Sequence, residues 1–119
     1  MMLRPEQLIH QAVIAHLKAR SVPGLVYFHC PTGAHYSGKR QGQIMKSLGV
    51  RAGVSDLILF HNSRFYCLEL KAEGGRASEA QLAFLSEADA AGAYTAMPEG
   101  LNAALATLEA WDLVKGVVT

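Results

Sequence analysis

The sequence predicts an α/β fold in which helices flank a mixed β-sheet, in one domain that spans residues 1–119. Segments with helical periodicity alternate with short β-branched or aromatic runs, in the order helix, strand, helix, strand, strand, helix, strand, helix. A chain of 119 residues, with 50% hydrophobic and 18% charged residues, suits one folded domain with a single core.

The first helix and strand are predicted near the N-terminus. Residues 5–19 carry apolar side chains at helical spacing, and Pro5 suits a first helical position. The turn residues 22–24 end this helix. Residues 25–30 then form a short run of β-branched and aromatic residues, which predicts a strand.

A loop and a brief helix are predicted next. Residues 31–42 are rich in Gly, Ser, Thr, Lys and Arg, which is typical of a loop. Residues 41–48 predict a short helix that ends at Gly49. The side chains of this helix that we expect to face inward are Ile44, Met45 and Leu48.

The centre of the chain predicts a β-hairpin. The runs 56–60 and 65–71 have strand composition, and the loop 61–64 separates them. Ser78 then opens a helix that Gly92 stops.

The last two elements are a short strand over 93–97 and an amphipathic helix over 102–115. Trp111 lies on the apolar side of this helix with Leu105 and Leu108. We expect it to pack in the core or a subunit interface, in preference to stacking on bases.

Membrane, secreted and disulfide-rich classes are excluded by the apolar residues and the cysteines. No apolar run approaches the roughly 18 residues that a membrane-spanning helix needs, and the N-terminus lacks the apolar stretch of a secretory signal. Cys30 and Cys67 are too few for a disulfide framework or a zinc site, so we expect small buried side chains. We therefore expect a cytoplasmic protein without a membrane segment.

Charge is unevenly distributed along the chain. Residues 1–76 hold ten Lys or Arg against four acids, whereas residues 77–119 hold one Lys against six acids. A basic front and an acidic back suit a protein that meets a polyanion with one side. Halves of a sequence need not become faces of a fold, so charge alone does not identify the partner.

The predicted hairpin brings two acids together. If its loop closes symmetrically, Phe60 faces Phe65 and Asp56 falls opposite Glu69, with Cβ atoms roughly 5 Å apart. Two carboxylates at that separation repel, and a hard cation between them removes the cost. Lys71 lies two residues beyond Glu69 and points to the same face. Acid, acid and lysine on one face suit metal-assisted phosphodiester hydrolysis.

On spacing alone, an ordinary half-exposed strand explains this pattern equally well. Charged and leucine residues alternate on any such strand, and Asp56 could simply cap a turn.

The sequence resembles the PD-(D/E)XK nuclease superfamily at these residues, and more closely the virus-type replication-repair nuclease (VRR-NUC) family. The match runs over most of the chain, with several motifs in the right order and at the right separations. The stretches that carry it are Glu6 in the first helix and residues 31–33, 42–48, 49–57, 69–71 and 78–81. The superfamily's proline before the Asp is Ser55 here. The resemblance implies a restriction-endonuclease-like fold.

The resemblance also implies roles for individual residues. Asp56 and Glu69 would hold Mg²⁺ or Mn²⁺, with Glu6 and the backbone carbonyl of Leu70 contributing. Lys71 and Gln81 would complete the catalytic set by positioning the attacking water. Taken alone, Glu6 is an ordinary first-turn acid and Gln81 forms a capping box with Ser78; for Gln81 both readings can hold.

A cationic segment precedes the acidic hairpin in the sequence. Its DNA-binding candidates are Lys39, Arg40, Lys46 and Arg51, with His35 and Tyr36 among them. Cations beside an aromatic side chain can grip phosphates and stack on bases, although a solvated loop has the same composition. The glycine spacing of residues 33–40 does not fit a Walker loop, so no nucleotide cofactor is expected. The histidines are scattered. His10 and His16 fall in the first helix and form no metal pair with a neighbour, and His29 and His35 lie near the proposed site in sequence but are not selected as ligands.

The expected function is that of a metal-dependent DNA endonuclease whose products carry a 5′-phosphate and a 3′-hydroxyl, as the resemblance implies. The family also implies a homodimer that resolves four-way (Holliday) junctions, because a two-fold axis suits symmetrical cuts. Two alternatives stay open. One is flap, nick or general duplex cleavage by the same site, and the other is a non-catalytic DNA-binding module.

Overall fold

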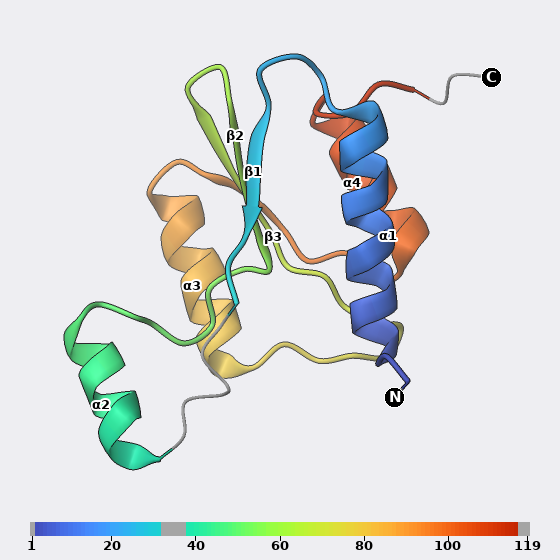
Figure 1. The fold of residues 1–119 in the computed structure, drawn as a ribbon. Helices are drawn as coiled ribbons and strands as arrows, with labels where there is room; N and C mark the ends of the chain where they lie inside the picture. The colour runs from blue at the N-terminus through green and yellow to red at the C-terminus, as the bar shows by residue number, and fades with distance from the viewer. Residues whose placement is uncertain (1, 32–37, 117–119) are drawn as a thin grey trace.

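The computed structural model of the protein describes residues 2–31 and 38–116. Across this part of the chain, helices and strands follow one another in the predicted order (Figure 1). None of the described helices combines the length and the apolar character required to cross a bilayer.

A mixed four-stranded sheet lies at the centre of the fold. Its strands are β1 (Val26–His29), β2 (Leu57–His61), β3 (Arg64–Leu68) and β4 (Tyr94–Ala96), and they neighbour one another in that order. The β1–β2 and β2–β3 pairs are antiparallel, whereas β4 runs parallel to β3. The mixed sheet predicted from the sequence is therefore confirmed.

The register of the β2–β3 hairpin is the predicted one, with Phe60 paired to Phe65. The turn is shorter than expected, because His61 and Arg64 pair as well and only Asn62 and Ser63 remain between the strands. Both turn residues have positive φ, of 50° and 65°, as a two-residue turn that matches the twist of the strands requires.

Two helices cover one side of the sheet and a third covers the other. The helices α1 (Pro5–Arg20) and α4 (Leu101–Ala110) lie side by side, and α3 (Glu79–Ala90) lies across the sheet from them (Figure 1). Since strand side chains alternate between faces, one set from the hairpin packs beneath α1 and α4. The buried members of this core include Leu57, Leu59, Tyr66, Leu68 and Leu70 from the hairpin with Val13, Leu17, Ala104 and Leu108 from the helices.

The C-terminal helix is shorter than predicted. It stops at Ala110 because Asp112 has a φ of 59° and turns the chain back to α1. Leu113 then enters the core, and Arg20 at the end of α1 donates to the Lys115 carbonyl at 2.7 Å. Trp111 packs against Tyr66 with ring centroids 5.1 Å apart and lies partly buried against the core, the first of the two places expected from the sequence.

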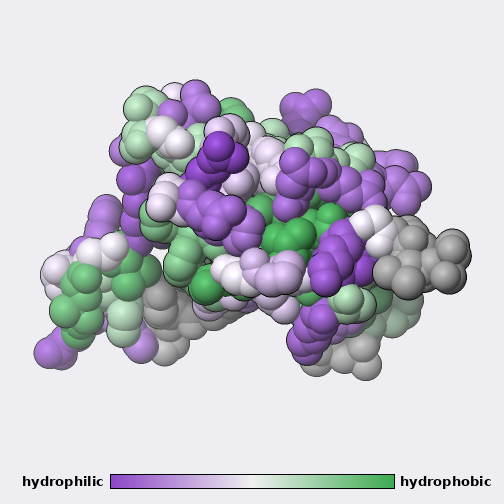
Figure 2. All heavy atoms as spheres, turned by 90° about the horizontal axis from the view of Figure 1, so that it is seen from above, coloured by the Kyte–Doolittle hydropathy of each residue, from purple (hydrophilic) through white to green (hydrophobic). Residues whose placement is uncertain are grey.

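The prediction for α2 (Lys39–Ser47) was wrong in two respects. The helix begins at Lys39, within the segment predicted as a loop. It projects from the body, so the predicted inward side chains of Ile44 and Leu48 are 47% and 72% exposed, and Met45 is only half-buried (Figures 1 and 2). Helical periodicity defines an apolar face, but it does not supply a neighbouring element to cover it.

A row of apolar side chains crosses the sheet on the face that α1 and α4 leave open. Val26 pairs with Phe60, which pairs with Phe65, and the two phenyl rings lie 5.4 Å apart. The exposed fractions of the three residues are 45%, 37% and 55%. Contiguous exposed apolar rows of this kind are typical of interaction surfaces.

Candidate active site

The predicted metal-binding and catalytic residues come together at one end of the sheet. The helices α1 and α3 both begin there, β1 ends there, and β2 starts there one residue after Asp56 (Figure 1). Helix N-termini carry partial positive charge. The N-termini of α1 and α3 therefore both favour carboxylates at this end of the sheet.

Asp56 and Glu69 are joined by crosswise hydrogen bonds just beyond the paired part of the hairpin. The backbone N–H of Asp56 donates to Glu69 Oε1 at 3.2 Å, and the backbone N–H of Leu70 donates to Asp56 Oδ2 at 2.8 Å. Each carboxylate is therefore oriented by the backbone of the opposite strand extension. The structure places the two acids opposite each other, as the register predicts.

Glu69 is almost completely buried, with 2% of its surface exposed. Burial, together with the neighbouring charge of Asp56, raises the pKa of Glu69 to about 8, and Lys71 opposes the shift. The protein thus holds a carboxylate where the negative form is disfavoured unless positive charge is supplied.

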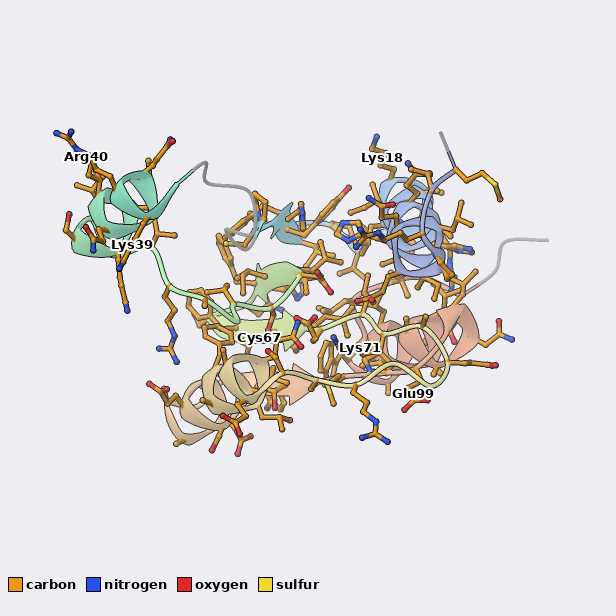
Figure 3. The ribbon with its side chains drawn as sticks, turned by 90° about the horizontal axis from the view of Figure 1, so that it is seen from below. Lys18, Lys39, Arg40, Cys67, Lys71 and Glu99 are labelled. Carbon is orange, nitrogen blue, oxygen red and sulfur yellow. The ribbon has the colours of Figure 1, made fainter. Side chains whose placement is uncertain are left out.

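Lys71 is also buried, and Gln81 connects it to Glu69. Lys71 Nζ donates to Gln81 Oε1 at 3.0 Å, and Gln81 Nε2 donates to Glu69 Oε2 at 2.9 Å. Lys71 Nζ itself lies 3.7 Å from Glu69 Oε2. Figure 3 shows Lys71 in the interior of the molecule.

The same Gln81 side chain caps α3. Its Oε1 atom accepts from the backbone N–H of Ser78 at 2.9 Å, while the N–H of Gln81 donates to Ser78 Oγ at 3.1 Å. The capping box expected from the sequence is therefore formed, and the same amide contacts Lys71 and Glu69, whereas its catalytic role stays a prediction. The capping box fixes the amide that contacts Lys71 and Glu69, so the start of α3 and the acidic pair are tied together.

Gly53 allows α3 to approach the strand that carries Asp56. It has a φ of +83°, and a Cβ atom there would lie within 2.7 Å of the Gln81 nitrogen and closer still to the Ala80 carbonyl. Ser55, which stands where the superfamily has proline, is fully buried, and its hydroxyl has no hydrogen-bond partner among the described residues. The segment before Asp56 is therefore packed tightly against the start of α3.

Three carboxylates converge on a position that fits a divalent cation. Glu6, Asp56 and Glu69 each offer an oxygen, and these atoms all lie within 4.8 Å of one another. Glu6 Oε1 is also 3.8 Å from Lys71 Nζ. Oxygen donors are the ligands that Mg²⁺ and Mn²⁺ accept. A cation there would also favour the charged form of Glu69, whose pKa is raised by burial.

Sequence reasoning missed two histidines that lie beside Asp56. His10 and His29 pack edge to face with ring centroids 4.4 Å apart, and with Asp56 they form a second possible group of metal ligands. One signal was available, because His10 follows Glu6 by one helical turn and so shares its face of α1. His29 gave no signal, since only the pairing of β1 with β2 brings it to the site.

The cationic candidates are exposed and lie apart from this cluster. Lys39 and Arg40 are on α2, well away from Lys71 (Figure 3), and Lys46 follows on the same helix. Arg51 binds the Glu87 carboxylate through both terminal nitrogens, at 3.2 and 2.6 Å. His35 and Tyr36 lie outside the described residues.

Comparison with known proteins supports the fold. No model of a protein family matches the chain, and no curated protein sequence matches it either. Among solved structures, the chain is similar to a VRR_NUC domain protein, with a TM-score of 0.75 and 18% sequence identity over 93% of this chain and 90% of that chain. The restriction-endonuclease-like α/β fold expected from the sequence is therefore confirmed.

Replacing Gly53 with alanine should destabilise the protein and disturb the Gln81 contacts. The added Cβ would push against the Ala80–Gln81 backbone, and we expect a loss of about 2 kcal/mol in the free energy of unfolding. Urea titration measures this loss. Gly49→Ala is the matched control, because Gly49 has a similar φ of +96° but open space around its Cβ position. Equal losses in the two variants would show that the contact with α3 is unimportant.

The metal-free protein should lose stability as pH rises from about 5 to about 8. The pKa of Glu69 is about 8 in the folded state against 4.5 in its ordinary state. The folded protein therefore binds the extra proton in this window, and its stability is highest below it. The slope contributed by one such group is at most about 1.4 kcal/mol per pH unit.

Urea titrations in EDTA at several pH values, with wild type and Glu69→Gln, measure this contribution. The difference in unfolding free energy between the two proteins separates the contribution of Glu69 from that of His10. Burial lowers the pKa of His10, so its contribution makes stability rise with pH, opposite to that of Glu69. If the free energy of unfolding changed with pH in the same way in wild type and in Glu69→Gln, the raised pKa of Glu69 would be contradicted.

Proposed function

We propose that this chain, which has the fold of a VRR_NUC domain protein, is a metal-dependent DNA endonuclease. The observation that carries the proposal is the continuous network of Asp56, Glu69, Gln81 and Lys71, with Glu6 beside it. Burying a lysine and a glutamate costs stability. Lys71 and Glu69 both lie near the N-termini of α1 and α3. The stability cost of burying them is explained if the two side chains act in catalysis.

Asp56, Glu69 and Glu6 would hold Mg²⁺ or Mn²⁺, and the Leu70 carbonyl would contribute a fourth oxygen. When bound, such an ion polarises the phosphate and lowers the pKa of water. The buried Leu70 side chain and its N–H bond to Asp56 fix the backbone from which that carbonyl projects.

Lys71 supplies the fixed cation of the site. Its ammonium group has three donors, one of which is directed to Gln81. The others are available to orient the attacking water and to offset negative charge on the phosphate in the transition state. Gln81 fixes the positions of Lys71 and Glu69 relative to each other through one hydrogen bond to each. We therefore assign it a positioning role in catalysis.

The substrate that we propose is a four-way DNA junction cut by a homodimer, leaving a 5′-phosphate and a 3′-hydroxyl. The resemblance of the motifs to VRR-NUC nucleases supports this choice. A dimer is further supported by the exposed row of Val26, Phe60 and Phe65, which offers an apolar contact surface. Two equivalent sites related by a two-fold axis suit paired cuts across the junction.

We propose that α2 binds a part of the DNA away from the cut. Lys39, Arg40 and Lys46 are exposed on this projecting helix, and their charge suits phosphate contacts. Arg51 belongs to the same group if DNA phosphate replaces Glu87 as its partner. Contacts of this kind fix the position of the duplex without reading its sequence.

Purified protein should cut labelled four-way junctions in the presence of Mg²⁺ or Mn²⁺ and not in EDTA. Glu69→Gln and Lys71→Met should each reduce the cleavage rate by about 100-fold or more, because each removes a group that acts in the transition state. Glu73→Gln and Lys18→Ala change exposed charges on neighbouring elements and should cut normally. Sedimentation of the same samples gives the oligomeric state.

The outcomes of this assay separate the alternatives. Equal cleavage of junction and linear duplex would remove the junction preference and keep the nuclease. Junction binding without cleavage under either metal would overturn the nuclease and leave a DNA-binding module.

Replacing Lys39, Arg40 and Lys46 together with alanine should weaken DNA binding with little effect on the turnover of bound DNA. Each lost phosphate contact reduces the slope of log K against log salt by about 1. Fluorescence anisotropy at several salt concentrations measures the slope. A triple variant of Lys18, Arg64 and Lys115, exposed cations outside α2, is the control. If both triple variants lost the same DNA affinity, α2 would contribute no more to DNA binding than other exposed cations do.

A further inference from the structure

Two histidines and Asp56 form a second set of donors next to the three carboxylates. One candidate ligand atom from each of His10, His29 and Asp56 lies within 4.8 Å of the others. The three residues come from α1, the end of β1 and the position just before β2, so their meeting is a product of the fold. Neither histidine is needed for the roles that we assign to Lys71 and Gln81.

The backbone fixes which nitrogen of His29 is free. His29 Nδ1 lies 2.7 Å from the carbonyl oxygen of Asp56. A carbonyl oxygen only accepts hydrogen bonds, so Nδ1 carries the proton and Nε2 keeps its lone pair in the neutral ring. Metal-binding histidines typically have this arrangement, with one ring N–H held by a carbonyl and the other nitrogen facing the ion.

The histidines open onto the same cavity as two of the carboxylates. An open cavity of about 440 Å³ is lined by His10 and His29 together with Glu6 and Asp56. His29 is exposed and His10 is half-buried, whereas Glu69 lies behind them in the interior. An ion held by the histidines would therefore keep positions open to water or to a phosphate from solvent.

We propose that Asp56 is shared by two metal positions, and that His10 and His29 complete the outer one. Its nitrogen donors favour Zn²⁺ and similar transition-metal ions, with Mn²⁺ the weakest binder of that series, whereas the inner position, made only of oxygens, suits Mg²⁺ and Mn²⁺. The inference rests on the proposed function only through Asp56, which both positions share. It assigns metal binding to two side chains and can be tested without DNA.

Nuclear magnetic resonance of histidine side chains labelled with ¹⁵N tests the outer position directly. Before metal is added, His29 should be in the tautomer with the proton on Nδ1. Zn²⁺ should then shift the ring nitrogens of His10 and His29 and leave those of His16 and His61 in place. Saturating Mg²⁺, which the inner position binds, should produce in none of the four the large shift that coordination of a ring nitrogen gives. Rings of His10 and His29 that do not respond to Zn²⁺ would overturn the inference.

Counting bound ions gives a second measure. Calorimetric titration with Mn²⁺ should find two ions per chain in the wild type, one in His10→Ala and His29→Ala, and a large loss of both in Asp56→Asn. His16→Gln, on the same helix as His10, should keep two. His29→Gln repeats the test with a side chain of similar size, and backbone spectra establish that each variant is folded. Two ions of unchanged affinity in the folded histidine variants would contradict the outer position.

The two proposals fail in different ways. Wild type that binds two ions through these histidines but cuts no DNA would remove the nuclease and keep the second site. Metal-dependent cleavage with one bound ion and unresponsive rings would remove the second site and keep the nuclease.

Discussion

The structure around Asp56 and Glu69 is arranged to offset the cost of holding their two carboxylates face to face. Two acids held by the hairpin register repel, and burial of Glu69 adds a desolvation cost, which together raise its pKa to about 8. The surroundings reduce this cost in several ways at once. Backbone N–H groups donate to both acids, Lys71 lies beside them, and the starts of α1 and α3 are directed to the same place.

The packing of α3 is part of the same arrangement. The helix can approach the acidic pair because Gly53 leaves no side chain in its path. Its capping box then orients Gln81, whose amide accepts from Lys71 and donates to Glu69. One short helical turn thus caps α3 and connects the segment before β2 to the residues that follow β3. A site of this kind is held by rigid elements, as positioned proton and phosphate chemistry needs.

The site changes character from the interior to the surface. Glu69 and Lys71 are closed off from solvent, Asp56 is partly exposed, and Glu6, His10 and His29 line the open cavity. Hard oxygen donors dominate inside and imidazole nitrogens appear outside. A ligand that enters from solvent would therefore contact the outer donors first and Lys71 last. The projecting α2, with its cations and exposed apolar face, extends the potential contact surface beyond this opening (Figures 2 and 3).

The order of the elements, the hairpin register and the facing positions of Asp56 and Glu69 could be predicted from the sequence, because these features depend on local periodicity and on residues close in the chain. The position of α2 could not be predicted in this way, since an apolar stripe on a helix does not reveal which element covers it. Nor could the meeting of His29 with His10 and Asp56 be predicted, because that contact joins β1, α1 and β2 through strand pairing and helix packing between segments far apart in sequence.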